Sequence, residues 1–179
     1  MWGVLLVLLY FAAALIAAAV LLQPDRFIVR RTAVIDAAPE QVFRQINDLH
    51  NWAGWSPWAS LDPAARIDYF GAACGAGASV EWSGDRSVGA GRMTIVDSLP
   101  AESVTLKLDL LRPFQASHDV YFSLTPENGG DASRTRVDWS LVGRAGLLAK
   151  ALNLLMSREK SLGGRFEQGL SNLQAACAA

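Results

Sequence analysis

The fold is decided by the stretch FIVRRTAVIDAAPEQVF, residues 27–43, in which a strand is followed at once by a helix. Residues 27–35 are rich in β-branched and aromatic side chains, which favour a strand. Pro39 suits the first position of a helix, and Glu40 lies in the first turn, near the positive end of the helix dipole. Short spacing puts three apolar side chains on one face of this helix: Val42, Phe43 and Ile46.

Downstream of the helix the pattern is that of an antiparallel sheet. Residues 52–58 hold three tryptophans, and Pro57 makes this segment a loop or a broken turn. Strands are predicted over 79–83, 89–96 and 104–110, followed by one that begins near His118 and a last one near 135–141. Residues 104–110 alternate strictly, so their even-numbered side chains share one face of the sheet. Asn128-Gly129-Gly130 predicts the final hairpin turn.

The chain closes with a long predicted helix over residues 147–176. Its core-facing stripe recurs every three or four residues and contains one carboxylate: Leu148, Leu152, Leu155, Glu159, Leu162, Phe166, Leu170 and Leu173. One amphipathic helix against a strongly curved antiparallel sheet is an α+β architecture. Gly163-Gly164 inside this helix costs up to about 1 kcal/mol per glycine relative to Ala. The pair predicts a close approach of a strand, a kink, or a ligand beneath the helix.

Before the first strand, residues 2–22 form an uncharged apolar run. As a helix this run rises about 31 Å, close to the ~30 Å thickness of the hydrocarbon core of a bilayer. We therefore predict a transmembrane anchor over 1–24 and a soluble domain over 25–179. A cleaved signal peptide is the alternative, although no basic residue precedes the run. Arg26, Arg30 and Arg31 follow it, which favours a cytoplasmic domain over a periplasmic or extracellular one.

Composition excludes several classes of protein. Of 179 residues, 51% are hydrophobic and 18% are charged, so the chain is not disordered or collagen-like. The net charge is −1 and there is no basic stripe, which argues against nucleic acid as a partner. Cys74 and Cys177 are too few for a disulfide framework or a metal knuckle. The glycine-rich residues 71–77 lack a phosphate-loop lysine, so we interpret them as a strand connection. We expect no metal and no cofactor.

Several motifs resemble the START-related, polyketide cyclase/dehydrase-like (SRPBCC) superfamily. The resemblance spans residues 27–176 and is carried by residues 35–43, 46–48, 52–58, 163–167 and 169–173. It implies a helix-grip fold, in which a curved antiparallel sheet wraps around a long carboxy-terminal helix. It also implies a deep, mostly apolar cavity between the sheet and that helix. It does not specify function, because members of the superfamily bind lipids, catalyse cyclisation or regulate other proteins.

Glu159 is the sharpest anomaly in the predicted core stripe. A carboxylate that faces an apolar cavity either pairs with a cation or has its pKa raised by desolvation. Arg31 is the candidate partner, because it shares a strand face with apolar residues. Two interpretations stay open. In the structural one, Glu159 turns to the rim of the cavity or forms an ion pair with Arg31; in the functional one, it orients the polar head of a ligand or acts as a general acid or base.

The other candidate site residues share the face that should line the cavity. His118 has the parity of inward-facing residues, although it lies near the start of its strand, where exposure is expected. Tryptophans 55, 58 and 82 serve either in plain packing or as a ligand platform. The predicted ligand-binding set is Arg31, Trp55, Trp58, Trp82, Leu106, Leu108, Phe122, Trp139, Leu152, Leu155, Glu159 and Phe166.

Three functions follow from these observations. The first is a membrane-tethered binding or carrier module for a hydrophobic small molecule or lipid. The second is a cyclase or dehydratase that uses Glu159 or His118 as general acid or base; the scarcity of titratable groups on the apolar face counts against an enzyme. The third is a protein-interaction or regulatory module with the same fold. The sequence does not specify the ligand or the oligomeric state.

Overall fold

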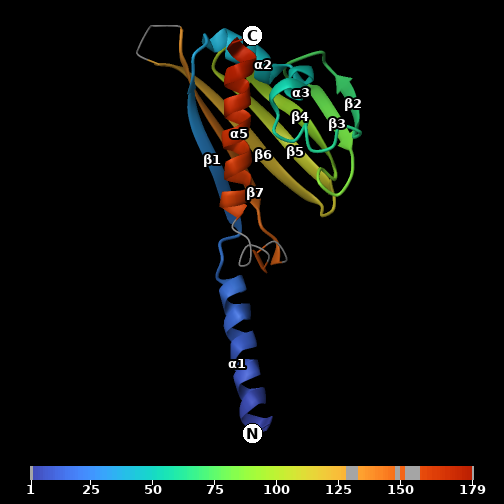
Figure 1. Ribbon diagram of the computed structural model, residues 1–179, viewed down its shortest axis with the longest axis vertical. Helices are drawn as coiled ribbons and strands as arrows, with labels where there is room; N and C mark the ends of the chain where they lie inside the picture. Colours follow the sequence, from blue (N-terminus) through green and yellow to red (C-terminus); the bar gives the residue numbers. More distant parts are fainter. Residues whose placement is uncertain (1, 128–132, 148–149, 152–157, 179) are drawn as a thin grey trace.

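The computed structural model describes residues 2–127, 133–147, 150–151 and 158–178, with the side chains of residues 158 and 159 excepted. Its centre is a seven-stranded antiparallel sheet in the order β1-β7-β6-β5-β4-β3-β2. The strands are β1 (Arg26–Ile35), β2 (Arg66–Gly71), β3 (Ala78–Ser83), β4 (Ala90–Leu99), β5 (Ser103–Arg112), β6 (Ala116–Pro126) and β7 (Thr135–Arg144). This curved sheet and the helix on its face confirm the predicted α+β, helix-grip architecture (Figure 1).

Helix α5 (Arg158–Ala178) lies across the concave face of the sheet (Figure 1). Phe166, Leu170 and Leu173 of α5 are buried, as the core stripe predicts. Leu148, Leu152 and Leu155 of the predicted helix lie outside the described residues. Two further helices, α2 (Pro39–Asn47) and α3 (Trp52–Trp55), with the 3-10 helix η1 (Leu49–Asn51) between them, cover one end of the same face.

Two local predictions need correction. Strand β2 was not predicted; it is a short edge strand whose side chains are mostly exposed, so the alternation of Arg66-Ile67-Asp68-Tyr69 spans only four residues and marks no buried face. The tryptophan segment is not wholly a loop, since Trp52–Trp55 form the helix α3. The indole nitrogens of Trp52 and Trp55 donate to the carbonyls of Ile46 and Gln45 at 2.9 and 3.1 Å. These bonds satisfy carbonyls at the end of α2, which would otherwise be orphaned.

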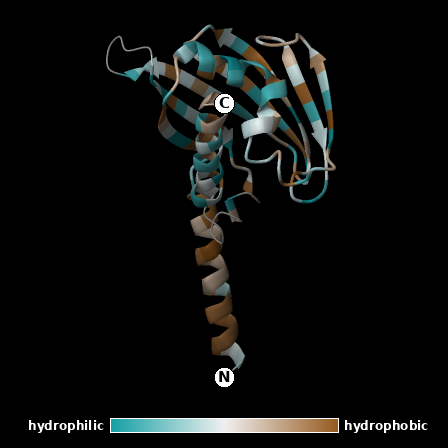
Figure 2. Cartoon of the chain, turned by 45° about the horizontal axis from the view of Figure 1, so that its top comes forward, coloured by the Kyte–Doolittle hydropathy of each residue, from teal (hydrophilic) through white to brown (hydrophobic). Residues whose placement is uncertain are grey.

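Helix α1 (Trp2–Leu21) is hydrophobic along its length, and it projects away from the sheet (Figure 2). It buries no residue in the domain, and by length and composition it could cross a membrane or be a signal sequence. The segment that follows it is held against the domain. Lys150 Nζ donates to Asp25 Oδ1 at 2.5 Å, and Gln23 Nε2 donates to the Lys150 carbonyl at 3.1 Å. The Lys150 ammonium holds the pKa of the Asp25 carboxyl below its usual value.

The glycines of α5 explain why this helix lies so close to the sheet. A Cβ at Gly163 would collide with the Arg31 guanidinium of β1, which confirms the predicted close approach of a strand. A Cβ at Gly169 would lie 2.7 Å from Trp139 Cζ3 and 3.0 Å from Pro57 Cδ. A Cβ at Gly164 would meet no atom within 4 Å. Gly169 is therefore required by packing against rigid rings, whereas the atom nearest Gly163 is the end of the flexible Arg31 side chain, and Gly164 is unconstrained.

We predict opposite effects for alanine at two of these glycines. Gly169→Ala should destabilise the domain by about 1–3 kcal/mol, because Trp139 and Pro57 are buried and cannot give way freely. Gly164→Ala, the matched control, should stabilise it by about 0.5–1 kcal/mol through helix propensity. Urea unfolding of the full chain in detergent, followed by tryptophan fluorescence, measures both. Equal effects of the two substitutions would contradict the packing of α5 on Trp139.

Candidate ligand-binding cavity

A cavity of about 740 Å³ lies between the concave face of the sheet, the tryptophan segment and the first turns of α5. This volume falls in the ~300–1,000 Å³ range of small-molecule sites. Its wall is mostly aliphatic and aromatic, with side chains from strands, loop and helix: Trp58, Ile67, Val80, Trp82, Met93, Leu108, Leu110, Val120, Trp139, Leu141, Leu162 and Phe166. The alternation of each strand explains this wall, because every second side chain points into the concavity.

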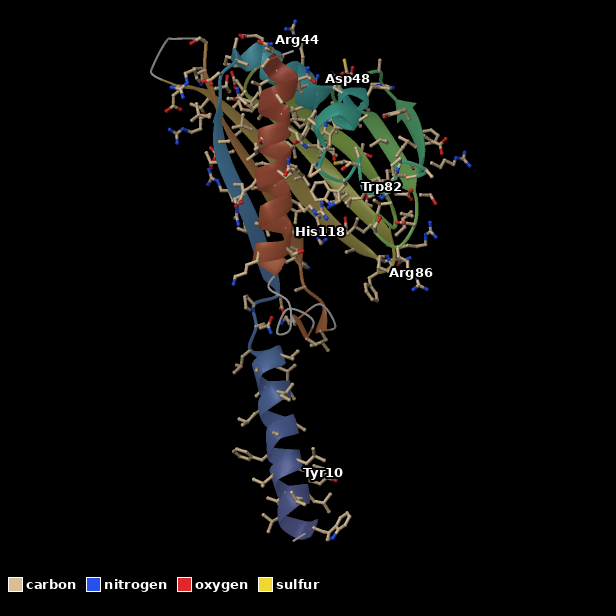
Figure 3. All side chains as sticks on the ribbon, in the orientation of Figure 1. Tyr10, Arg44, Asp48, Trp82, Arg86 and His118 are labelled. Atoms are coloured by element: carbon tan, nitrogen blue, oxygen red, sulfur yellow. The ribbon has the colours of Figure 1, made fainter. Side chains whose placement is uncertain are left out.

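Trp82 is fixed in the wall by its neighbours. Its partner across the β3–β4 pair is Gly91, and a Cβ at Gly91 would lie 2.5 Å from Trp82 Cζ2. The absent side chain leaves room for the indole to lie flat against the strand. Trp82 Nε1 donates to the Val88 carbonyl at 3.0 Å, so the ring has both a steric and a polar constraint. Figure 3 shows Trp82 and His118 on the face of the sheet toward α5.

Few polar side chains reach the described wall of the cavity. His118 on β6 is half-buried, and the edge of its ring contacts Phe27, with centroids 5.6 Å apart. Tyr69 on β2 stacks on His50 at 3.9 Å, and burial, followed by the nearby Asp48 charge, raises the pKa of the Tyr69 hydroxyl. Asp62 accepts backbone N–H bonds from Ala64 at 3.0 Å and Asp85 at 2.8 Å. The tyrosine therefore stays neutral near pH 7, and the aspartate links its own loop to the loop that contains Asp85.

The structure brings part of the predicted ligand set to the cavity wall. Five of its members line the wall, and so does the candidate general acid or base His118: Trp58, Trp82, Leu108, Trp139 and Phe166. Three others are absent from the described wall and are almost fully buried in the core: Trp55, Leu106 and Phe122. The reason is that α2 and α3 fill the concavity at one end, so inward-facing residues there contact protein instead of open space.

Arg31 is also absent from the described cavity wall. Its Nε donates to Glu167 Oε1 at 2.6 Å, and its guanidinium lies beside Gly163 on α5. The structure thus shows an ion pair between Arg31 and the carboxy-terminal helix, with Glu167 as the described partner. The side chain of Glu159, and Leu152 and Leu155, lie outside the described side chains. Their roles in ligand binding stay predictions.

An aromatic cluster separates the filled end of the concavity from the open end. Trp139 stacks on Phe166 with centroids 4.1 Å apart and on Phe122 with centroids 4.9 Å apart. Trp55 and Trp58 contact the same indole edge-on at 5.8 and 6.1 Å. Trp139 Nε1 is buried and has no hydrogen-bond partner among the described residues. Ring packing therefore holds this indole in place.

Several wall residues were missed at the level of sequence. Val80 and Met93 lie opposite one another on β3 and β4, and their parity with neighbouring inward residues was a usable signal. Ile67 and Tyr69 come from the unpredicted β2, where they alternate with the charged Arg66 and Asp68, so the same signal was present there. Within the described residues, no group of three or more His, Cys, Asp or Glu side chains is placed to hold a metal ion. Cys74 is exposed, Cys177 is buried, and both are free thiols.

Residues 26–178 match the family described as polyketide cyclase / dehydrase and lipid transport. No curated protein is similar enough in sequence to match.

Solved structures of low sequence identity share the fold. Protein CV1439 from Chromobacterium violaceum aligns with a TM-score of 0.60 at 15% identity, over 88% of this chain and 99% of that chain. The Aha1 dimer from Colwellia psychrerythraea aligns at 0.58 and 14% identity, over 84% and 96%. The di-domain ARO/CYC StfQ of the steffimycin biosynthetic pathway aligns at 0.59 and 11% identity, over 86% of this chain and 51% of that chain.

Proposed function

The chain belongs to the polyketide cyclase / dehydrase and lipid transport family, and from this premise we propose that it binds a hydrophobic small molecule or lipid while α1 tethers it to a membrane. The observation that carries the proposal is the cavity of about 740 Å³ with its mostly apolar wall. An apolar pocket with few polar groups selects its ligand by shape and hydrophobicity.

Burial of apolar surface alone gives such a pocket enough affinity to bind a lipid, without specific polar contacts. A lipid that buries ~400 Å² of apolar surface gains ~10 kcal/mol at ~25 cal/mol/Å², before the costs of association. The described wall adds aromatic rings from Trp58, Trp82 and Trp139, which contact a ligand at low cost in side-chain entropy. This supports binding of a molecule that partitions into lipid.

The tether is supported by helix α1, whose apolar length suits a bilayer. Arg26 and Arg30 follow the helix and are exposed, and basic residues at a membrane exit favour the cytoplasmic side. A tethered cavity stays next to the bilayer in which its ligand dissolves. We propose a single-pass arrangement with the domain in the cytoplasm, against the alternatives of a cleaved signal sequence and of a domain on the opposite side.

The tether predicts that the mature protein retains α1. Protein extracted from membranes should have the intact mass of the full chain, and it should resist washing with alkaline carbonate. A mass that lacks the first ~20 residues would show cleavage and would remove the anchor from the proposal. Protease protection of inverted and right-side-out vesicles assigns the side, because only a domain outside the vesicle is digested.

Ligand uptake predicts lipid contacts inside the cavity. The full chain in nanodiscs that contain a phosphatidylcholine with a photoactivatable acyl chain should be cross-linked at cavity peptides, including the peptide that contains Met93. Leu108→Trp, which fills the cavity from β5, should reduce these cross-links at least tenfold.

Tyr121→Trp is the matched control for this experiment. Tyr121 lies on the neighbouring strand β6, 40% exposed on the convex face, so its cross-links in the cavity should equal those of the parent. Cross-links at α1 serve as an internal standard in both variants. If Leu108→Trp retains the cavity cross-links, the binding proposal is contradicted, and an interaction module becomes the better interpretation.

A cyclase or dehydratase reaction is the second candidate function, favoured by the position of His118 in the cavity wall. A histidine that reaches a bound substrate can remove a proton from a carbon between two carbonyls, after which ring closure and loss of water follow. Incubation with a short 3,5,7-triketo ester, in which the carbon between the ester and the 3-keto group can add to the 7-keto carbon and close a six-membered ring, should then yield a product 18 Da lighter by loss of water. His118→Phe, which keeps the ring volume, should abolish this product while leaving photo-cross-linking intact. No mass loss with the parent protein rejects the enzyme for this substrate class.

A further inference from the structure

The antiparallel order of the sheet places several loops at the same end as α1. Because β1 begins at Arg26, directly after the link that follows α1, its pairing with β7 puts Arg144 at that end. The remaining pairings place there the start of β6, the end of β5, the start of β4, the end of β3 and the start of β2. We name this end of the sheet, with its hairpins at residues 84–89 and 113–115, the α1-proximal end (Figure 1).

Charge is unevenly distributed between the two ends. The α1-proximal end presents five exposed arginines: Arg26, Arg66, Arg86, Arg112 and Arg144. Asp25 pairs with Lys150 and Asp68 pairs with Arg66, while Asp62 accepts a hydrogen bond from the Asp85 backbone and Asp85 accepts one from Ser87. Arg26, Arg86, Arg112 and Arg144 therefore supply most of the positive charge of this end. The opposite end holds the acidic residues Asp36, Glu40, Asp48, Asp97, Glu102 and Glu127, of which Asp36 pairs with Arg134 and Glu127 pairs with Arg136. Figure 3 shows Arg86 near the α1 side of the domain and Asp48 at the opposite end.

Several large apolar side chains are exposed at the α1-proximal end, namely Ile28, Ile67, Leu111, Phe114 and Leu147. Leu111 is 54% exposed and Phe114 is 59% exposed, and both flank the turn between β5 and β6. The neighbouring hairpin holds this turn in place. Gly89 has φ +64°, and a Cβ there would collide with the Arg112 carbonyl, so the two hairpins pack backbone to backbone. Exposed apolar side chains beside arginines are the composition of surfaces that bind the membrane interface.

The cavity extends to this same end. Its wall includes Val88 before β4, Leu110 near the end of β5, Ala116 at the start of β6, and Ser161 in the first turns of α5. The orientation of α1 relative to this end is also constrained. Ala145 N donates to the Asp25 carbonyl at 2.7 Å, in addition to the bonds that Lys150 makes to the same link. A bilayer crossed by α1 therefore faces the end at which the cavity wall terminates.

From these observations we propose that the α1-proximal end is a membrane-docking surface. Leu111 and Phe114 insert into the interface of the bilayer that α1 crosses, while the arginines contact phosphates of anionic lipids, so that ligand passes between lipid and cavity without crossing water. This inference rests on the proposed function, in which α1 is a tether and the cavity takes an apolar ligand. The partner of this surface is a lipid bilayer for two reasons. The short link between α1 and β1 is hydrogen-bonded to the domain, so the α1-proximal end faces the bilayer that α1 crosses, and the arginines at this end are complementary to anionic headgroups.

Depth measurement by electron paramagnetic resonance tests the docking. A nitroxide is attached at Phe114→Cys in a Cys74→Ser background, in the full chain, in nanodiscs with and without phosphatidylglycerol. The matched control site is Leu99→Cys, which is 49% exposed at the end of β4, on the opposite end of the sheet. Leu111→Cys replaces Phe114→Cys if the first variant does not fold.

The measured quantity is the ratio of the collision rate of the label with oxygen to its collision rate with a water-soluble nickel chelate. In anionic nanodiscs we expect this ratio to be at least fivefold higher at position 114 than at position 99. Arg86→Glu should lower the docking equilibrium constant about 25-fold, because each unit of charge near an anionic surface contributes a factor of about five. Arg44→Glu, at the opposite end, should leave it unchanged. Docking should also weaken when phosphatidylglycerol is omitted.

Equal aqueous accessibility of positions 114 and 99 would overturn the docking proposal. Cavity cross-links measured in the same nanodiscs separate this outcome from a failure of the proposed function. Cross-links without docking would support the proposed ligand binding and contradict the proposed docking surface. Docking without cross-links would keep the surface and contradict the binding module. Failure of the full chain to enter nanodiscs would contradict the tether, on which both depend.

Discussion

Trp139 lies between Phe166 of α5 and Phe122 of β6, and this stack of three rings fixes α5 on the sheet. Because Gly169 has no side chain, the helix backbone approaches the indole closely enough for the stack to form. On one side of the stack, α2 and α3 fill the concavity with packed residues, including the fully buried Trp55. On the other side the concavity is open. The cavity therefore exists because α5 packs on this aromatic stack while its first turns span a part of the concavity that α2 and α3 leave open.

The chemistry of the open side follows from this arrangement. Every strand contributes alternate side chains, and at the open end these are mostly aliphatic or aromatic, so the described wall offers few charges to a ligand. Arg31, which the sequence places on the inward face, is drawn out of the cavity by Glu167 on α5. A buried guanidinium without a partner would be costly, and the ion pair at the helix surface removes that cost. The pocket is left apolar, which suits a ligand taken from lipid.

Alternation and helix periodicity in the sequence were enough to predict the architecture, because the strands 104–110, 118–124 and 135–141 do bury the faces that parity assigns. The odd or even position of a residue in a strand predicts which face it lies on, but it does not distinguish packed core residues from residues that line the cavity. Leu106 and Leu108 share a face of β5, yet Leu106 is fully buried under α2 and α3 while Leu108 lines the cavity. That difference depends on where the covering helices end, which is tertiary information. Strand β2 was missed for a related reason: as an exposed edge strand it has little apolar pattern.

The direction in which the cavity lies relative to α1 is a consequence of strand order. The chain enters the sheet at the α1-proximal end of β1, and β7, its antiparallel neighbour, returns to that end before α5 begins. Helix α5 then runs away from α1, so its first turns lie nearest α1. Ser161 and Leu162 in these turns line the cavity. The return of β7 depends on the connection through α2, η1 and α3, which carries the chain from the far end of β1 back to the α1-proximal end, so that the six alternating strands β2–β7 finish where β1 begins. One alternating strand more or fewer would place the first turns of α5 far from α1. The seven-stranded order thus couples the cavity to the amino-terminal helix, and the hydrogen bonds from Lys150 and Ala145 to Asp25 make that coupling rigid at the point of entry.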